Sequence, residues 1–457
     1  MMVTYFLQAY DKGILSSSTQ FGILDDLHLS KVIGHTKSGK AITDNKKFAN
    51  VSMIFYIGYL VGTYPMMLLA QRYSPSRVLG GATIIWGAVV MSTAGCTTYA
   101  GLMVNRVFLG VFESAVAPGF TVLVTFWWTR EEQALRLSFW YSCVGLATVV
   151  SPLLNYALGQ IHSHFLPWKP LFLILGAVTV VWGFVLTFTL PDDPLKTKGL
   201  NEDERKIAIA RLERNRAGTI NHNFKGEQIK EAFTDYKVWS SALIILLTGV
   251  PSGALGTFGT LVINGFGYNH FHSLALTCPI GAITFVSIMA AGYLNRRVPN
   301  MRYITILVTV LISMAGTLIC WIKGPTGHKG LLYAGILLLA IQVAAGGLAV
   351  SLAASNIAGH TKKSMVSATT FVGYCVGNII GPNIFGASPA PVYHAGFMGS
   401  TICLALVAVI ATASYIALRM ENARRDRRTG EASARVYHHH FDEDLSDKQN
   451  EDYRYIL

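Results

Sequence analysis

The 457-residue chain is 52% apolar and only 14% charged, with a mean hydropathy of +0.42. Soluble globular domains carry about 25% charged residues, so this composition, with repeated apolar runs long enough to cross a bilayer, excludes a soluble enzyme and indicates a polytopic membrane protein. The net charge of +12 comes from basic residues that collect in short loops and one tail, as in membrane proteins, and we expect no nucleic acid as a partner.

The first apolar segment, Met1–Ile23, is a poor membrane span because Asp11 and Lys12 lie in its middle. Either the span begins upstream of Met1 or this helix is short and truncated. Adjacent side chains on a helix project about 100° apart, so these two charges cannot pair well with each other. Each is expected to find a partner on another span. A polar, lysine-rich connector, Leu24–Phe48, follows.

The rest of the chain has a regular arrangement of spans on either side of a long polar linker. Five spans are predicted at 49–70, 78–98, 101–127, 137–160 and 169–190, and six more at 239–264, 273–294, 302–322, 331–354, 366–386 and 395–418. This predicts an all-α polytopic membrane protein with twelve transmembrane helices, built as two related six-helix bundles facing each other across a midplane cavity. The expected units are residues 1–190, the first bundle; 191–238, a cytoplasmic central loop with an amphipathic helix; 239–418, the second bundle; and 419–457, a polar cytoplasmic tail.

Arginine and lysine in the short loops predict which side of the membrane each loop faces. Placing the central loop inside also places Arg72, Arg77, Arg296 and Arg297 inside, and both termini become cytoplasmic. The lysines of the connector after the first span oppose this orientation, but they weigh less than the short loops combined. In the tail, the basic run 424–428 is interpreted as a topology anchor, with contact to anionic lipid as the alternative.

The stretch Val104–Phe120 carries Arg106 and Glu113 within an otherwise apolar span. Seven residues, or two helical turns, separate them, so both side chains project from nearly one face. A lone charge at the bilayer centre costs roughly 3 kcal/mol on insertion scales. The two charges indicate either part of a transport pathway or gate, or a structural ion pair between helices. By span direction Arg106 lies toward the outer leaflet and Glu113 nearer mid-depth.

Other spans supply polar groups that could face a pathway. Asn155 lies in the fifth span and Asn356 ends the tenth. In the eleventh span Tyr374 and Asn378 are four residues apart and share a helix face, which could hydrogen-bond a carboxylate or ureide, or else a neighbouring helix. Glycines every four residues on another face of that span favour close packing. The small-residue run 249–259 could unwind to bind a ligand or serve as a packing interface.

Enzyme and cofactor motifs are not found in the sequence. There is no GxxxxGK[ST] loop, so ATP-driven pumping is not expected, and the six cysteines form no CxxC pair. The tail's three consecutive histidines give no closed coordination site. We therefore expect no enzyme activity, no cofactor and no metal site.

Seven stretches carry a family resemblance that covers most of the chain. They are YFLQAYDKGILSSSTQFGI, IFYIGYLVGTYPMMLLAQRY, NRVFLGVFESAVAPGF, WKPLFLILGAVTVVWG, LPDDPLKTKGLNEDER, VPSGALGTFGTLVINGFGY and SNIAGHTKKSMVSATTFVGYCVGNIIGP. With these stretches the chain resembles the major facilitator superfamily and, within it, the fungal allantoate permease family of anion:cation symporters. The resemblance implies two pseudo-symmetric six-helix bundles, alternating access, and proton-driven uptake of small organic anions such as allantoate, ureidosuccinate, nicotinate or pantothenate.

The chain departs from that family's pattern in four places. The loop after the second span reads Gln71-Arg72-Tyr73-Ser74 where the superfamily has an Asp-Arg pair, and the equivalent loop after the eighth span also lacks the aspartate. The N-terminus is short for the family, and the stretch 31–50 reads as an insertion in a compact outer loop. The inner gate is therefore expected to be weaker or to use other groups.

The resulting hypothesis is a monomeric, proton-coupled importer of a small organic anion, in the lipid bilayer of the plasma membrane. Arg106 is expected to hold a substrate carboxylate, a protonatable partner or the outer gate through charge-assisted hydrogen bonds. Glu113 is the better candidate for the proton carrier and Asp11 the other. The alternative is a receptor-like membrane protein that does not transport, or a truncated gene product.

Overall fold

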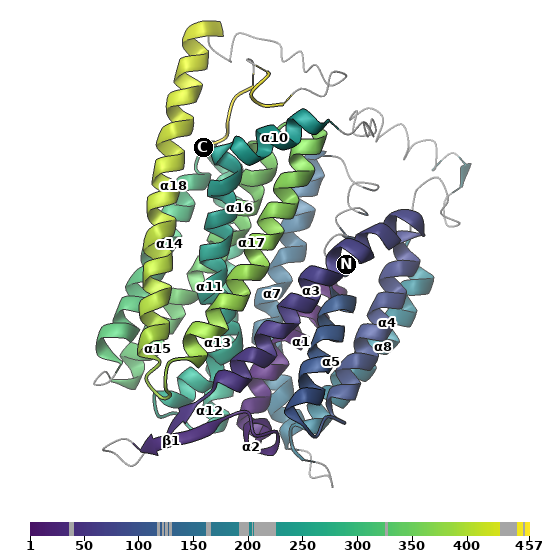
Figure 1. Cartoon of the computed structure of the whole chain (residues 1–457), viewed down its shortest axis with the longest axis vertical. Helices are drawn as coiled ribbons and strands as arrows, with labels where there is room; N and C mark the ends of the chain where they lie inside the picture. Colours follow the sequence, from purple (N-terminus) through teal and green to yellow (C-terminus); the bar gives the residue numbers. More distant parts are fainter. Residues whose placement is uncertain are drawn as a thin grey trace.

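Long helices run side by side through the whole computed structural model (Figure 1). The structure describes residues 1–35, 41–116, 119–120, 123, 127, 130–160, 166–191, 201–202, 204, 225–324, 328–429, 446–450 and 453–457. The predicted surface helix at 201–216 and the three tail histidines lie almost entirely outside these residues.

Two groups of helices make up the molecule, here called the first half and the second half. The first half contains α1 (Met2–Ser18), α3 (Lys46–Arg72), α4 (Pro75–Thr93), α5 (Tyr99–Glu113), α7 (Arg130–Gly159) and α8 (Lys169–Thr189). The short helix α10 (Gly226–Thr234) precedes the second half. The second half contains α11 (Tyr236–Gly265), α12 (His270–Ala275), α13 (Thr277–Arg297), α14 (Arg302–Lys323), α15 (Lys329–Leu339), the 3-10 turn Ala340–Gln342, α16 (Val343–Ser355), α17 (His360–Gly386) and α18 (His394–Thr429).

Helix length and hydropathy agree with a membrane-spanning protein. Among the described residues, nine helical segments are long and apolar enough to cross a bilayer. Three further helices, α1, α4 and α5, pack beside them. This arrangement confirms the predicted all-α polytopic fold and is compatible with twelve spans. The first helix, α1, has 17 residues in this chain.

Glycine-lined helix contacts hold each half together. On α3, a Cβ at Gly58 would overlap the carbonyl of Val107 on α5, and one at Gly62 would lie 2.6 Å from Val111 Cα. On α17, Cβ atoms at Gly377 and Gly381 would overlap backbone carbonyls of α11. The predicted close packing is therefore confirmed, because only glycine lets these backbones approach so closely. Of the two alternatives for the small-residue run 249–259, the structure shows the packing interface: α11 continues through its proline, and Gly249 and Gly253 face α17.

The two halves pack against each other through α7 with α13 and α3 with α17. They also meet at the end of the bundle that carries a small β-hairpin, here called the hairpin end. Strands β1 (Lys31–His35) and β2 (Ala41–Asp44) pair antiparallel there, beside the short helices η1 (Thr19–Phe21) and α2 (Ile23–Asp26). The lysine-rich connector, predicted as a polar loop, thus forms this hairpin. The opposite end, which carries α10 and the C-terminus, is here called the linker end (Figure 1).

Polar contacts join the halves at the hairpin end. The hydroxyls of Ser16 on α1 and Thr260 on α11 lie 3.0 Å apart, and Thr260 donates to the Ser16 carbonyl at 2.7 Å. Next to the hairpin, the Ala390 N–H donates to the carbonyl of Thr43 at 3.2 Å, and Asn45 donates to the Tyr393 hydroxyl at 3.3 Å. These contacts close the hairpin end around the polar groups deeper in the bundle.

Candidate functional site

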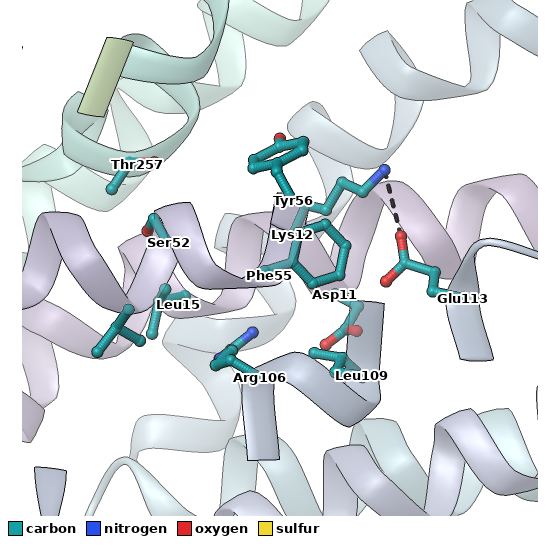
Figure 2. Close-up of a pocket in the computed structure, with 11 residues that line it drawn as sticks. Asp11, Lys12, Leu15, Ser52, Phe55, Tyr56, Arg106, Leu109, Glu113 and Thr257 are labelled. Atoms are coloured by element: carbon teal, nitrogen blue, oxygen red, sulfur yellow. Dashed lines mark ion pairs between the residues drawn. The ribbon is translucent and has the colours of Figure 1, made fainter. Parts of the chain in front are cut away.

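A charged pocket lies between α1, α3 and α5, with one side closed by α11 (Figure 2). About 340 Å³ of space lies among its side chains, part of it open to solvent. Four ionisable side chains line it: Asp11, Lys12, Arg106 and Glu113. The structure therefore brings together the four intramembrane charges that were singled out in the sequence.

An ion pair joins two of these charges across the pocket. Lys12 Nζ lies 3.2 Å from Glu113 Oε1, and Glu113 is fully buried whereas the Lys12 side chain is 28% exposed (Figure 2). The ammonium also lies over the rings of Phe55 and Tyr59 on α3, at 5.7 and 5.3 Å from the ring centres. Cation–π contacts of this kind stabilise a cation that has lost part of its hydration. Lys12 is thus held by one carboxylate and two aromatic faces.

Asp11 is held by a different kind of contact. The indole Nε1–H of Trp86, on α4, donates to Asp11 Oδ2 at 2.9 Å, and both residues are buried. The other carboxylate oxygen, Oδ1, has no hydrogen-bond partner among the described residues. Trp86 therefore fixes the position of Asp11 and leaves one of its oxygens available.

Arg106 is a buried cation, and two of its hydrogen-bond donors have no partner among the described residues. It is 3% exposed, and its guanidinium lies 5.7 Å from the ring centre of Phe172 on α8. Within the described part of the chain, its Nε and Nη2 atoms have no hydrogen-bond partner. The N–H bonds of these two nitrogens point the same way, and together they form the edge of a guanidinium that receives a carboxylate in bidentate fashion. Two uncommitted donors on a buried cation make this edge a ready anion site.

The remaining predicted pathway residues differ in how close they come to this pocket. Asn155 on α7 is fully buried and accepts a 2.8 Å hydrogen bond from Tyr10, the neighbour of Asp11 on α1. The Tyr374 ring packs 6.2 Å from Tyr56, a residue of the pocket lining. Asn378 instead donates to the carbonyl of Tyr374 at 2.8 Å and faces the glycine run of α11, so its amide takes part in helix packing.

Five predicted residues lie away from the pocket, at the linker end. Asn356 follows α16 and exchanges hydrogen bonds with the backbone of Ile456. The arginines predicted to gate are exposed and sit at helix termini: Arg72 ends α3, Arg77 is in the first turn of α4, and Arg296 and Arg297 end α13. They remain gate candidates by position alone.

Sequence reasoning missed the residues that hold the charges in place. Trp86, Phe55 and Tyr59 lie on neighbouring spans, and their spacing along the chain shows no link to Asp11 or Lys12. The available signal was weak: an indole N–H in an apolar span needs an acceptor. The sequence does not show which acceptor that is.

Comparison with known proteins shows the family of the chain. The family model of the Major Facilitator Superfamily matches residues 1–382. The chain belongs to that superfamily. An uncharacterised transporter of Schizosaccharomyces pombe, C757.13, is 34% identical over all of this chain and 84% of its own length. The allantoate permease of Saccharomyces cerevisiae and the thiamine pathway transporter THI73 of the same yeast are each 30% identical, over 100% and 99% of this chain and 84% and 83% of their own lengths.

Solved structures support the same fold. An inward-open structure of the xylose transporter XylE from E. coli has a TM-score of 0.68 at 12% identity, covering 89% of this chain and 93% of its own. A bacterial homologue of the human lysosomal transporter Spinster, inward-facing and unoccupied, has a TM-score of 0.66 at 15% identity, covering 91% and 94%. The chain is therefore an integral membrane transporter of the Major Facilitator Superfamily, and the predicted resemblance to the allantoate permease group is confirmed.

Proposed function

We propose that this transporter imports a small organic anion together with a proton, and that Arg106 receives the anion's carboxylate. The observation that carries the proposal is the buried Arg106 edge: Nε and Nη2 have no acceptor among the described residues, and Arg106 lines the charged pocket. Hydrogen bonds between a guanidinium and a carboxylate are roughly twice as strong as neutral ones. A carboxylate is the ligand that would satisfy both donors and cancel the buried charge.

The Lys12–Glu113 pair supplies the proton site of this proposal. Protonation of Glu113 would cancel its charge and release Lys12 from the ion pair. The freed ammonium, 28% exposed at the pocket, would then be a second cation for the anion. Proton binding and anion binding would thus favour each other, which is the thermodynamic requirement for symport. Asp11, with one free oxygen held near Arg106 in the same pocket, is the second candidate proton carrier.

Alternating access gives the two ends of the molecule their roles. We place the linker end in the cytoplasm, with both termini, because arginines gather there. The hydrogen bonds between Ser16 and Thr260 and around Tyr393 hold the two halves together at the opposite end, which we assign to the outer gate. Import at the plasma membrane, by a monomer, is the simplest arrangement that this orientation supports.

Uptake measurements test the proposal. A yeast strain that lacks its own permeases would express the wild-type chain and receive labelled allantoate, ureidosuccinate, nicotinate and pantothenate, with and without a protonophore. We expect protonophore-sensitive uptake of at least one anion, and its loss in Arg106→Gln. The matched control is Arg419→Gln, an exposed arginine of α18 outside the pocket. Normal surface expression with no uptake of any anion would favour the receptor-like alternative, and uptake that Arg106→Gln leaves intact would remove the proposed site.

A further inference from the structure

A second buried cluster of charges lies at the linker end, and none of its residues lines the charged pocket. At its centre is Lys362, in the first turn of α17, whose side chain is fully buried. Its Nζ lies 2.7 Å from Glu231 of α10, 2.6 Å from Asp235 and 2.7 Å from Asp447 of the C-terminal segment. One ammonium therefore joins three separate parts of the chain.

The three carboxylates could hold a metal ion by spacing alone, since their oxygens lie within 4.8 Å of one another. The Lys362 ammonium already occupies the position between them. Lys237, on α11, completes the set, with its Nζ 3.0 Å from Asp235 and 2.9 Å from the second oxygen of Asp447. These five residues are called the linker-end cluster below. An internal ion network therefore accounts for the acidic residues.

Asp447 is the member of this cluster that comes from the C-terminal segment, Ser446–Leu457. Its two carboxylate oxygens form ion pairs with different lysines: Oδ1 with Lys362 and Oδ2 with Lys237. Without Asp447, the two buried ammonium groups would share only Asp235 and Glu231. Leaving a buried charge underpaired is strongly unfavourable. Asp447 therefore ties the segment to the second half.

Side-chain amides also recognise the backbone of the segment. Asn356 donates to the carbonyl of Ile456 at 2.9 Å and accepts from its N–H at 2.7 Å. Asn422 likewise donates to the carbonyl of Tyr455 at 2.8 Å and accepts from its N–H at 2.9 Å. Each side-chain amide thus makes the two hydrogen bonds that a neighbouring β-strand would make with the segment's backbone. Arg425 donates to three backbone carbonyls of the segment, at 2.9 to 3.1 Å. These contacts are those of a peptide in a binding site.

The linker helix α10 is attached to the same place. Gln228 Oε1 accepts from the backbone N–H groups of Thr361 and Lys362, at 3.1 and 3.2 Å, and so caps the start of α17. Glu231, one turn further along α10, pairs with Lys362. Because Lys362 also binds Asp447, the position of α10 depends on the same ammonium that holds the segment. Docking of the segment and fixing of the linker helix are therefore physically coupled.

We propose that the linker-end face of the second half is a peptide-docking surface whose ligand is the chain's own segment Ser446–Leu457, and that the docked segment fastens the linker helix α10 to the second half. A ligand tethered by a short stretch of chain has an effective concentration on the order of millimolar. The segment therefore occupies its site nearly all the time, and weakening it opens the site to a free peptide. This proposal does not depend on which solute is transported.

Competition with a free peptide tests the docking surface in the purified full-length protein. The probe is a fluorescein-labelled peptide of residues 446–457, followed by fluorescence anisotropy. We expect it to bind the Asp447→Asn chain at least tenfold more tightly than the wild-type chain, whose own segment blocks the site. A peptide that carries Asn at position 447 should bind the same variant at least tenfold more weakly. The control is Lys323→Ala, an exposed lysine at the end of α14 and outside the cluster, which should behave as wild type.

Hydrogen exchange tests the fastening of α10. In Asp447→Asn, amides of residues 226–234 and 453–457 should exchange at least tenfold faster together, while those of α14 stay unchanged. If that variant fails to fold, Tyr455→Ala weakens the segment from within and replaces it in both experiments. Equal peptide binding to every chain, or to none, would overturn the docking surface. Faster exchange in the segment with unchanged exchange in α10 would overturn the fastening.

Discussion

Trp86 donates to Asp11 at 2.9 Å, and Trp86→Phe is expected to weaken binding of the anion at Arg106. The indole keeps one oxygen of Asp11 engaged, and Asp11 and Arg106 line the same pocket. Phenylalanine has no donor, so Asp11 would turn toward the unpaired edge of the guanidinium and compete with the substrate. A hydrogen bond to a charged group contributes about 1.5–3 kcal/mol. The KM should therefore rise roughly ten- to a hundredfold.

Initial rates of uptake, measured over a range of concentrations of the best-transported anion, give this KM. The competition argument makes a second prediction: Asp11→Asn in the Trp86→Phe background should restore most of the affinity, because the amide no longer competes for the cation. The matched control is Trp168→Phe. Trp168 also donates from its indole to a carboxylate, Asp26, at 3.2 Å, but lies outside the pocket lining.

The reasoning would be refuted in either of two ways. Trp86→Phe could leave KM within twofold of wild type while the protein reaches the membrane normally. Alternatively, the loss could persist in the double variant with Asp11→Asn, which would show that Trp86 acts by filling space and not by holding the carboxylate. A comparable rise in KM for Trp168→Phe would also remove the specific role of Trp86.

Three further predictions concern the proton, the helix packing and the C-terminal segment. Glu113→Gln should reduce uptake and abolish its dependence on external pH, measured with and without a protonophore; retained pH dependence would move the proton site elsewhere. Gly381→Ala should lower the unfolding temperature, because overpacking against the Val250 carbonyl costs about 1–3 kcal/mol, whereas Gly256→Ala, whose Cβ meets open space, should not. Burial alone would raise the pKa of Asp235, but the two cluster lysines lower it below its ordinary 3.8. The ionised Asp235 carboxylate therefore stabilises the docked segment above pH 3.8, and this stabilisation is lost only as pH falls below that value. Hydrogen exchange should find the segment docked from pH 7 down to about pH 4. Release of the segment near pH 6 would contradict this prediction.

The fold could be predicted from the sequence because hydropathy acts locally. Nine segments of the described residues are long and apolar enough to cross a bilayer by their own residues, and the resemblance supplied the arrangement of the two halves. The pairing of Lys12 with Glu113 could also be anticipated, because charges within the spans are few and each needs a partner. The close contact of α17 with α11 followed from glycines such as Gly377 and Gly381, whose four-residue spacing puts them on one face.

Other parts of the site could not be predicted, because they depend on contacts between residues far apart in the chain. Asn378 shares a face with Tyr374, yet its amide is used by the helix backbone and the packing with α11. Asn356 was assigned to the pathway because it ends an apolar span, but its partner Ile456 is a hundred residues away. The tail was interpreted as polar and cytoplasmic, and no periodicity in it points to the buried position of Asp447.

The most direct test of the central claim compares a carboxylate with its uncharged amide in wild type and Arg106→Lys. The probe pair is the best-transported acid of the panel and its own amide, such as nicotinate and nicotinamide. Lysine keeps the positive charge but loses the two parallel donors of the guanidinium. We predict that wild type takes up the acid at least tenfold better than the amide, and that Arg106→Lys loses this preference while Arg419→Lys, at an exposed position of α18, keeps it. An unchanged preference in Arg106→Lys would contradict the assignment of Arg106 as the carboxylate site.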